Sequence, residues 1–341
     1  MGRLSLSDRC LLVYTYGFRK LQGSLFSVKL LNMNSPFTKP LGCLVFLMLF
    51  SVFAFSQHLA DLEFKTNVER PAYSKNTPRV LFDEAHFNFH TSTGRYKPFA
   101  DLLTNDGYRV VVNRQSFTKK SLESFKLLII VNALGEDIDE VAAENSAFTD
   151  EECSVVRDWV RGGGALLLIA GRSPFGKAAA NLAKQFGVEM AGNFTQDNEH
   201  CAENNDSSLM VYSRENKLLL EHPITLGRDA EERIDRVIVF TGQSLKGPEE
   251  SLPFLKVADS ASDVIPSSSS EPPKTISARG RSQGLALKFG GGRLVVLGEA
   301  DMLSALLGSP PEKKPIGMNY PGIDNRQLAL NIMHWLSGLL K

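Results

Sequence analysis

The feature that most constrains the fold is an alternation of short apolar runs and amphipathic segments between residues 79 and 190. Two of these runs, Leu127–Val131 and Ala165–Ile169, are apolar at every position. Strands have such sequences when helices cover both faces of a parallel sheet. The alternation therefore predicts βαβ units in an open, mostly parallel α/β sheet with helices on both faces.

Two of the amphipathic segments carry clear helix signals. Thr149 and Glu152 form a capping box at the start of Thr149–Arg161. A final helix is predicted at Asp324–Leu340, with a capping pattern that begins at Asp324. Its apolar face is predicted to contain Leu328, Ile332, Trp335, Leu336 and Leu339.

The second half of the chain is less regular. Leu285–Phe289 and Arg293–Leu297 flank a run of three glycines, which predicts a C-terminal β-hairpin extension of the sheet. The polar stretch Gln196–Ser208 has the composition of a surface loop. Residues 258–283 are rich in serine and proline, which predicts a mobile loop.

The N-terminal 56 residues have the character of a targeting segment. Leu41–Phe55 contains fifteen residues without a charge, fewer than the ~20 that a membrane-spanning helix needs. Ala54 and Ser56 are small residues at the −3 and −1 positions of a cleavage site, so the segment matches a secretory signal cleaved after Ser56. Met33 is then a plausible start. The alternative is that residues 41–55 remain as a membrane anchor.

Export outside the cytoplasm is therefore expected, to the periplasm or beyond the cell. Residues 57–78 are predicted to be a linker arm, and residues 79–341 a single α/β domain. The chain has 38 basic and 38 acidic residues, which argues against a general nucleic-acid binder. Cys153 and Cys201 are far apart and form no CxxC motif, so neither a zinc knuckle nor a redox motif is predicted. Whether they pair stays open.

Ligands of open α/β sheets bind beyond the carboxyl ends of the strands. Several segments of this chain place polar side chains there. The candidate ligand-binding residues are Asp83, Glu84, His86, His90, Arg95, Arg172, Glu299, Asp301, Asn319 and Asp324. Their convergence on one edge is the strongest indication of function in the sequence.

The sequence does not predict a metal site. His86 and His90 are four residues apart and would share one face of a helix, where they could bind a divalent cation with nearby carboxylates. Asn88 and Thr91–Gly94 favour a loop instead. No cofactor is predicted.

Acyl-transfer chemistry is disfavoured by the residues at Gly171–Phe175. A nucleophile elbow has the pattern G-x-S-x-G, and Ser173 occupies the nucleophile position. The next residue must donate its backbone N–H to the oxyanion, and Pro174 has none. Acid–base chemistry by Asp83, His86 and Glu299 remains open, against the alternative that these carboxylates only brace loops.

Four stretches together resemble a known group of proteins. They are VLFDEAHFNFHTSTGRYKPFADLLTNDGYRV, GGGALLLIAGRSPFG, GGGRLVVLGEADMLSA and GMNYPGIDNRQLALNIMHWLSGLL. They resemble exported or membrane-linked bacterial proteins of unknown function with a class I glutamine amidotransferase-like domain. That group also takes in the auxiliary domain of gliding-motility-type ABC transporters and the N-terminal region of an intraflagellar transport subunit. The resemblance covers residues 79–189 and 285–340.

The resemblance implies a flavodoxin-like sheet but not amidotransferase activity. The enzymes of the group need a cysteine at the elbow, where this chain has Arg172 and Ser173. Members often have an Asp-His pair after this strand, which Gly171 and Arg172 replace here. The first expectation is a non-catalytic domain that binds a small polar ligand or a protein segment. The alternatives are a hydrolase using Asp83, His86 and Glu299, possibly metal-assisted, and an accessory subunit of a membrane transporter.

Overall fold

The computed structural model describes residues 58–138, 145–202, 206–265, 272–309 and 311–341. The predicted signal or anchor segment lies outside the described residues. Within them, no helix has the length and apolar character needed to cross a membrane.

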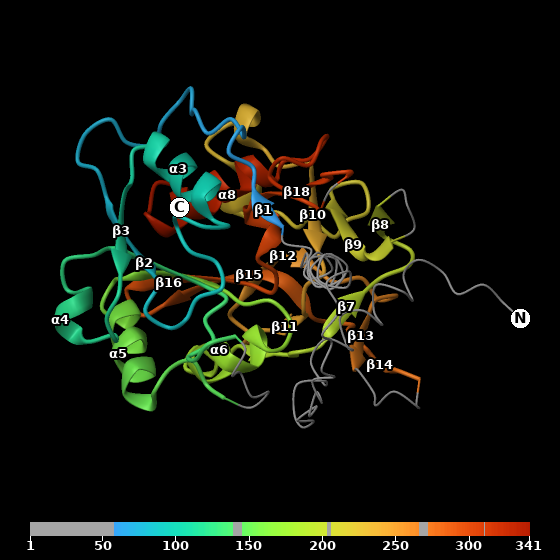
Figure 1. The fold of residues 1–341 in the computed structure, drawn as a ribbon, viewed down its shortest axis with the longest axis horizontal. Coiled ribbons are helices and arrows are strands. Elements are labelled where there is room, and N and C mark those ends of the chain that lie inside the picture. Colours follow the sequence, from blue (N-terminus) through green and yellow to red (C-terminus); the bar gives the residue numbers. More distant parts are fainter. Residues whose placement is uncertain (1–57, 139–144, 203–205, 266–271, 310) are drawn as a thin grey trace, which may run out of the picture. The chain divides into compact units, whose positions relative to one another are not determined.

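The centre of the fold is a nine-stranded sheet in which five strands run parallel to one another (Figure 1). These strands are β2 (Arg79–Asp83), β3 (Arg109–Asn113), β4 (Leu127–Val131), β5 (Ala165–Ile169) and β16 (Gly292–Leu297). Their order in the sheet is β3-β2-β4-β5-β16. In chain order this is 2-1-3-4-5, the flavodoxin-like arrangement. The predicted fold class is confirmed.

Antiparallel strands complete one side of the sheet. They are β15 (Ser282–Phe289), β12 (Leu252–Lys256), β11 (Leu245–Lys246) and β6 (Glu189–Met190). The predicted hairpin is present, with Phe289 opposite Gly292 at its turn. Its second strand, β16, pairs with β5 in parallel. The hairpin therefore joins the parallel and antiparallel parts of the same sheet.

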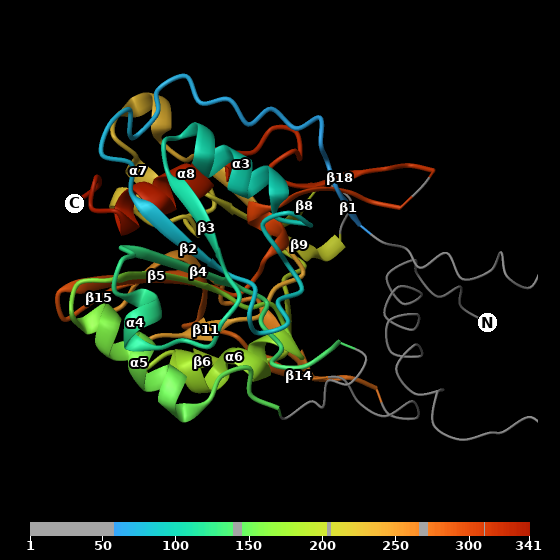
Figure 2. The same ribbon diagram turned by 60° about the vertical axis from the view of Figure 1, so that its left-hand side comes forward.

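Helices cover both faces of this sheet. Successive residues of a strand point to opposite faces, so an entirely apolar strand contributes to the core on both sides. Val80 and Phe82 belong to one apolar cluster, and Leu81 to the other. Figure 2 shows α3 (Lys97–Asn105) and α8 (Asn325–Leu336) on one face, and α4 (Lys119–Leu122), α5 (Asp150–Arg161) and α6 (Phe175–Lys184) on the other. The capping box of Thr149 and Glu152 at the start of α5 is confirmed.

Three small sheets surround the large one. They are β10 (Arg236–Phe240) with β9 (Asp206–Ser213) and β8 (Cys201–Ala202); β14 (Lys274–Ser277) with β13 (Ser262–Ile265) and β7 (Phe194–Gln196); and β1 (Leu59–Ala60) with β17 (Ala305–Leu307) and β18 (Pro315–Gly317). The remaining short helices are α7 (Pro223–Leu226), η1 (Ala230–Glu232) and η2 (Asp301–Leu303). Through β1, part of the predicted linker arm pairs with β17.

Two loop predictions are wrong over their described residues. The stretch 196–208 contains β8 and the start of β9, and residues 258–283 contain β13, β14 and the start of β15. The reason is visible at Asp263 of β13, a buried carboxylate that accepts hydrogen bonds from Thr195 Oγ1 (2.6 Å) and Ser244 Oγ (2.7 Å). A strand whose buried polar side chains are hydrogen-bonded can therefore be as polar in sequence as a loop.

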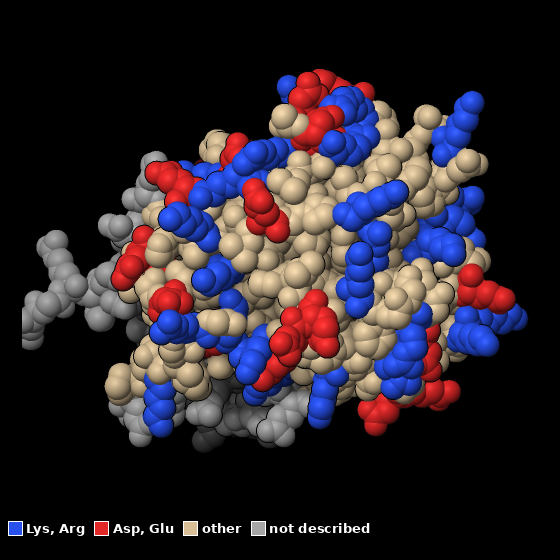
Figure 3. All heavy atoms as spheres, turned by 180° about the vertical axis from the view of Figure 1, so that it is seen from behind, with Lys and Arg blue, Asp and Glu red and all other residues tan. Residues whose placement is uncertain are grey.

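The two free cysteines are separate. Cys153 is buried in α5, and Cys201 is half-buried in β8. The charged surface is mixed, as the composition predicts. Figure 3 shows Lys and Arg side chains intermingled with Asp and Glu side chains on the face that it presents.

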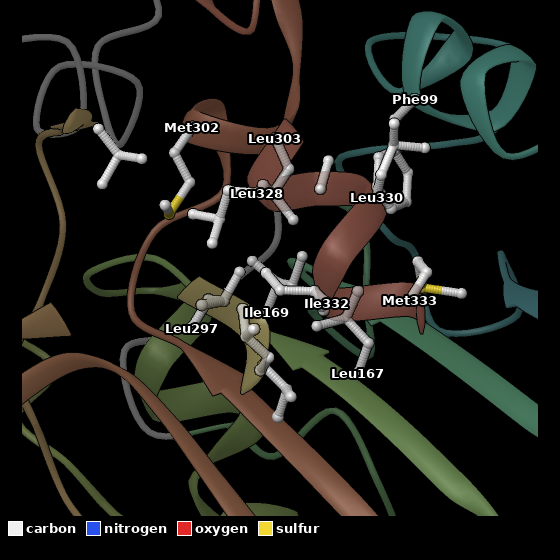
Figure 4. Packing of buried hydrophobic residues seen from close by; sticks show 14 of the residues in the cluster. Phe99, Leu167, Ile169, Leu297, Met302, Leu303, Leu328, Leu330, Ile332 and Met333 are labelled. Atoms are coloured by element: carbon white, nitrogen blue, oxygen red, sulfur yellow. The ribbon is translucent and has the colours of Figure 1, made fainter. Parts of the chain in front are cut away.

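Helix α8 supplies much of the core on its face of the sheet. Figure 4 shows Leu328 and Ile332 of α8 beside Leu167, Ile169 and Leu297 of β5 and β16. Asp324 occupies the N-cap position of α8, as predicted, but its side chain makes no capping hydrogen bond. The Asp324 carboxylate instead accepts the backbone N–H groups of Asp235 (2.8 Å) and Arg236 (3.0 Å).

The predicted place of Leu339 in the apolar face is wrong. The helix ends at Leu336, so the period that would bring Leu339 to the core is interrupted. Leu339 is 39% exposed, whereas Leu328 is fully buried.

The two leucines provide a matched test of the packing of α8. Leu328→Ala should lower the free energy of unfolding by about 2–5 kcal/mol, because it leaves a cavity in the core. Leu339→Ala should change it by less than about 0.5 kcal/mol. Urea denaturation measures both. Equal losses would mean that α8 packs through a different face.

Candidate functional site

The candidate site lies at the carboxyl ends of the parallel strands, where β2 and β4 are neighbours. This is the switch point of a 2-1-3-4-5 sheet, at which flavodoxin-like proteins hold their ligands. Here the chain itself crosses the switch point. The N–H groups of Leu134 and Gly135 donate to the carbonyl of His86 (2.9 and 3.0 Å), and the N–H of Phe89 donates to the carbonyl of Asn132 (3.0 Å). The loop after β2 is thus tied to the segment after β4.

His86 connects three elements through its imidazole ring. Its Nδ1 lies 2.8 Å from Asp83 Oδ2 at the end of β2, and its Nε2 lies 3.0 Å from Glu152 Oε1 in α5. The ring is buried between Phe117 and Phe148, with centroid distances of 4.7 Å to each. Because both ring nitrogens face a carboxylate oxygen, both donate protons, and the ring is an imidazolium.

The pKa values of this group agree with that assignment. Burial lowers the pKa of His86, but hydrogen bonds to and charges on Asp83 and Glu152 outweigh burial and leave the pKa above its ordinary value. Burial raises the pKa of Glu152, but hydrogen bonds from His86, Thr149 and Phe117 lower it to about 2. The buried group is therefore an ion triad in which one cation lies between two carboxylates.

His90 crosses the same edge in the opposite direction. Its Nδ1 lies 3.1 Å from the amide Nδ2 of Asn132, and its Nε2 lies 3.3 Å from Asp301 Oδ1. The Asn132 amide is oriented by Gly171 N–H, which donates to its Oδ1 (2.9 Å). Since Asn132 Nδ2 is a donor, His90 Nδ1 accepts and Nε2 carries the proton. His90 thus links the segments after β2, β4 and β5 to the segment after β16.

Two further side chains hold the loop in place. Asn88 donates to the carbonyl of Val131 (3.2 Å) and accepts the N–H of His86 (3.1 Å). Glu84 accepts both the N–H (2.9 Å) and the hydroxyl (2.6 Å) of Ser92. These contacts account for Glu84 as a bracing residue.

Glu299 and Asp301 lie at the other side of the edge. Glu299 is buried and accepts the backbone N–H groups of Asp301, Met302 and Phe240. Burial raises its pKa well above the ordinary value, and the charge of Asp301 adds to this effect. Tyr96 donates its hydroxyl to the carbonyl of Ala300 and stacks edge-on against His90.

The structure does not bring the proposed hydrolase residues together. Asp83 and His86 are in contact, but Asp83 and Glu299 share no partner among their hydrogen bonds. Their strands are three positions apart in the order β2-β4-β5-β16, a separation of roughly 14 Å at ordinary strand spacing. A catalytic carboxylate pair needs a much shorter distance.

The structure also does not place His86 and His90 together as a pair of metal ligands. His86 and His90 lie in an irregular loop and contact different partners. Among the described residues there is no cluster of three or more His, Cys, Asp or Glu side chains suited to a metal ion.

Some of the remaining candidate residues lie near the carboxyl edge of the sheet, and others lie away from it. Arg95 and Arg172 are half-buried, and the Arg95 guanidinium lies 4.5 Å from the centre of the Phe89 ring. Asn319 does not face the edge as predicted. Its amide donates to Asp61 Oδ2 and to the carbonyl of Leu306 (both 3.0 Å). Asp324, described above, holds the start of β10 and also lies outside the site.

Phe87, Asn88 and Phe89 were not among the sequence candidates, whereas the neighbouring His86 and His90 were. From His86 to His90 the polar side chains are buried and the aromatic side chains are exposed, which is the reverse of the usual pattern. His86, Asn88 and His90 are buried, whereas Phe87 is 56% and Phe89 is 36% exposed. The signal that could have found them is the strict alternation of polar and aromatic residues in HFNFH. Glu152 was predicted as a cap, but its contact with His86 spans 66 positions and is not local.

Comparisons with other proteins support the fold. No protein-family model matches the sequence, and no curated protein matches it. The structure is similar to the mmIFT52 N-terminal domain, with a TM-score of 0.52 and 16% identity over 76% of this chain and 97% of that chain. It is also similar to a ThuA-like protein from Bacteroides uniformis ATCC 8492, with a TM-score of 0.40 and 13% identity over 80% and 96%. The first similarity shows a shared fold, whereas the second score is too low to carry an argument.

Glu152→Gln tests the ion triad. It removes the negative charge that faces His86. The single amide oxygen can replace either Oε1, which accepts the Phe117 N–H, or Oε2, which accepts the Thr149 N–H, but not both. The free energy of unfolding should fall by about 2 kcal/mol near pH ~5.5, because the imidazolium loses one of its two counter-charges. Glu151→Gln, at the exposed neighbouring position, is the matched control and should change it by less than about 0.5 kcal/mol.

The difference between wild type and Glu152→Gln should also depend on pH. The contribution of Glu152 is present above its ordinary pKa of 4.5 and is lost as the pH falls toward about 2. The contribution of His86 is present below its ordinary pKa of 6.5 and is lost as the pH rises through its raised pKa in the folded protein. Urea titrations should therefore show the largest difference between pH 4.5 and 6.5. A difference that is constant across this range and above it would mean that His86 is neutral.

Proposed function

We propose that this chain is a non-catalytic binding module that captures a segment of a partner protein at the carboxyl edge of its sheet, outside the cytoplasm. The observation that carries this proposal is the reversed burial of residues 86–90. The loop places its polar side chains inside, fully hydrogen-bonded, and displays Phe87 and Phe89 to solvent.

This arrangement opposes the usual preference of the chain. Burying a phenylalanine side chain ordinarily stabilises a fold by about 1.5–3 kcal/mol. Phe87 also has a φ of +49°, a left-handed conformation that costs a non-glycine residue about 1–2 kcal/mol. The hydrogen bonds between the polar side chains of the loop and the ends of β2 and β4 offset both energetic costs.

The Phe89 ring contacts Phe175 and Arg95. We use the name aromatic cluster for these three residues together with the exposed Phe87 of the same loop. The ring centres of Phe89 and Phe175 lie 5.5 Å apart, and Arg95 covers Phe89. Aromatic residues and arginine are the side chains most enriched at protein interfaces and their hot spots. A partner segment with apolar side chains matches this composition better than a small polar ligand does, because the loop occupies the crevice that such a ligand would need.

Several contacts argue for binding over hydrolysis. Both ring nitrogens of His86 and of His90 are engaged within the protein, so neither ring has a nitrogen left to accept a substrate proton. Ser173 is followed by Pro174, which lacks the N–H that an oxyanion requires. The hydrolase alternative therefore has no geometric support.

The location is proposed from the N-terminal segment. Cleavage after Ser56 would release the module, whereas an uncleaved segment 41–55 would hold it at a membrane. In the second case the module could serve as an accessory subunit of a membrane transporter, which is the weaker reading.

Phe87→Asn separates stability from binding. Asparagine tolerates the left-handed conformation better than phenylalanine does, and the exposed ring is removed. The free energy of unfolding should therefore stay the same or rise by up to about 1 kcal/mol. Urea denaturation of the full chain measures this, and a loss of more than about 1 kcal/mol would mean that Phe87 is a structural residue.

The same variant should lose binding. Short peptides displayed on phage and selected on the full chain should be rich in aromatic or aliphatic residues. Phe87→Asn and Phe89→Ser should each weaken the selected peptides at least about tenfold. Ile276→Ser, at a residue that is 54% exposed on β14, is the control and should leave binding unchanged. Equal binding to all four proteins, or no enrichment on the wild type, would contradict the proposal.

A further inference from the structure

We propose a second binding site, independent of the aromatic cluster, for a small organic acid with an apolar body. It is a cavity of about 360 Å³ between α7, β12, β15 and α8, within the size range of small-molecule sites. Its lining consists of His222, Pro223, Glu250, Leu252, Ala286, Leu287, Lys288, Trp335 and Lys341. Because Lys288 is paired with Arg293 at the start of β16, the cavity lies at the end of the sheet opposite the loop after β2.

The group that points to a ligand is the imidazole of His222. Its side chain is only 4% exposed. Its Nδ1 accepts the N–H of Ile224 (3.1 Å), so in the neutral ring the proton is on Nε2. None of the hydrogen bonds among the described residues supplies an acceptor for this Nε2–H. The Nε2 atom is not enclosed by protein, so water or a ligand acceptor can reach it from the cavity.

The charge around His222 specifies what the acceptor should be. Burial lowers the pKa of His222 to about 4, and the nearby charges of Arg293 and Lys288 contribute to this effect. The ring is therefore neutral at physiological pH. The cavity is also lined by two lysines, Lys288 and Lys341, and by one carboxylate, Glu250, so its side chains carry a net positive charge and produce a positive potential. A carboxylate accepts the Nε2–H and also carries a negative charge that suits this potential. A neutral acceptor provides only the hydrogen bond, and a cationic group provides neither.

The rest of the lining specifies the body of the ligand. The Trp335 ring meets His222 edge-on at 5.3 Å, and Ala286, which belongs to the same apolar cluster as Trp335, also lines the cavity. The Leu287 side chain belongs to the cluster on the other face of the sheet and does not add to this apolar wall. Leu252, an exposed leucine of β12, forms part of the entrance. These apolar groups suit an aryl or alkyl chain that extends away from the carboxylate.

The test uses 4-phenylbutyrate as the probe and 4-phenylbutan-1-ol as its uncharged analogue. Isothermal titration of the full chain should give a Kd on the order of 0.1 mM for the acid, and at least about tenfold weaker binding for the alcohol. NMR of the His222 ring should show its pKa rising when the acid binds, because the carboxylate stabilises the charged form.

Three variants locate the binding. His222→Asn keeps an oxygen that can accept the Ile224 N–H but has no donor at the Nε2 position, and should weaken the acid at least about tenfold. Lys288→Gln, at an exposed residue that should not affect folding, should also weaken it. Lys246→Gln, at an exposed lysine of β11, is the control and should not.

The proposal is overturned if the acid and the alcohol bind equally well, or if His222→Asn and Lys288→Gln both bind as the wild type does. It is also overturned if Lys246→Gln weakens binding as much as Lys288→Gln, since the acid then responds only to general surface charge. If His222→Asn does not fold, Lys288→Gln and the NMR titration decide the question.

Discussion

The structure of the carboxyl edge depends on the imidazolium of His86 between Asp83 and Glu152. This one side chain joins the end of β2, the loop that follows it and helix α5. The triad is buried and has two carboxylates for one imidazolium, so removing either carboxylate takes away part of the stabilisation of that cation in a poorly polarisable environment. Its contacts hold the start of the loop at the end of β2 and against α5.

The loop changes what the fold can do. A flavodoxin-like sheet ordinarily leaves a crevice at its switch point for a ligand. In this protein His86, Asn88 and His90 fill that crevice and bond to the groups that a ligand would otherwise contact. We therefore propose that recognition uses the exposed rings of Phe87 and Phe89, while both histidines make contacts within the protein.

Much of the fold was predictable because its signals are local. The apolar runs of β4 and β5 and the capping box of α5 are each contained in a few neighbouring residues. The errors arose where a residue had a distant partner. The Asp324 side chain bonds to the start of β10 instead of capping α8, and Asp263 makes a strand from a sequence with the composition of a loop.

The sequence alone determined the layered α/β class, the absence of an amidotransferase nucleophile at Ser173, and the polar character of the edge. Only the tertiary structure decided which carboxylate each histidine meets. Glu152 and Asp301 lie 66 and 211 positions from their histidine partners, and such contacts follow from strand order and helix packing. The same non-local packing separates Asp83 from Glu299. It also leaves Phe87 and Phe89 exposed, because the polar side chains of that loop form hydrogen bonds on the inner side.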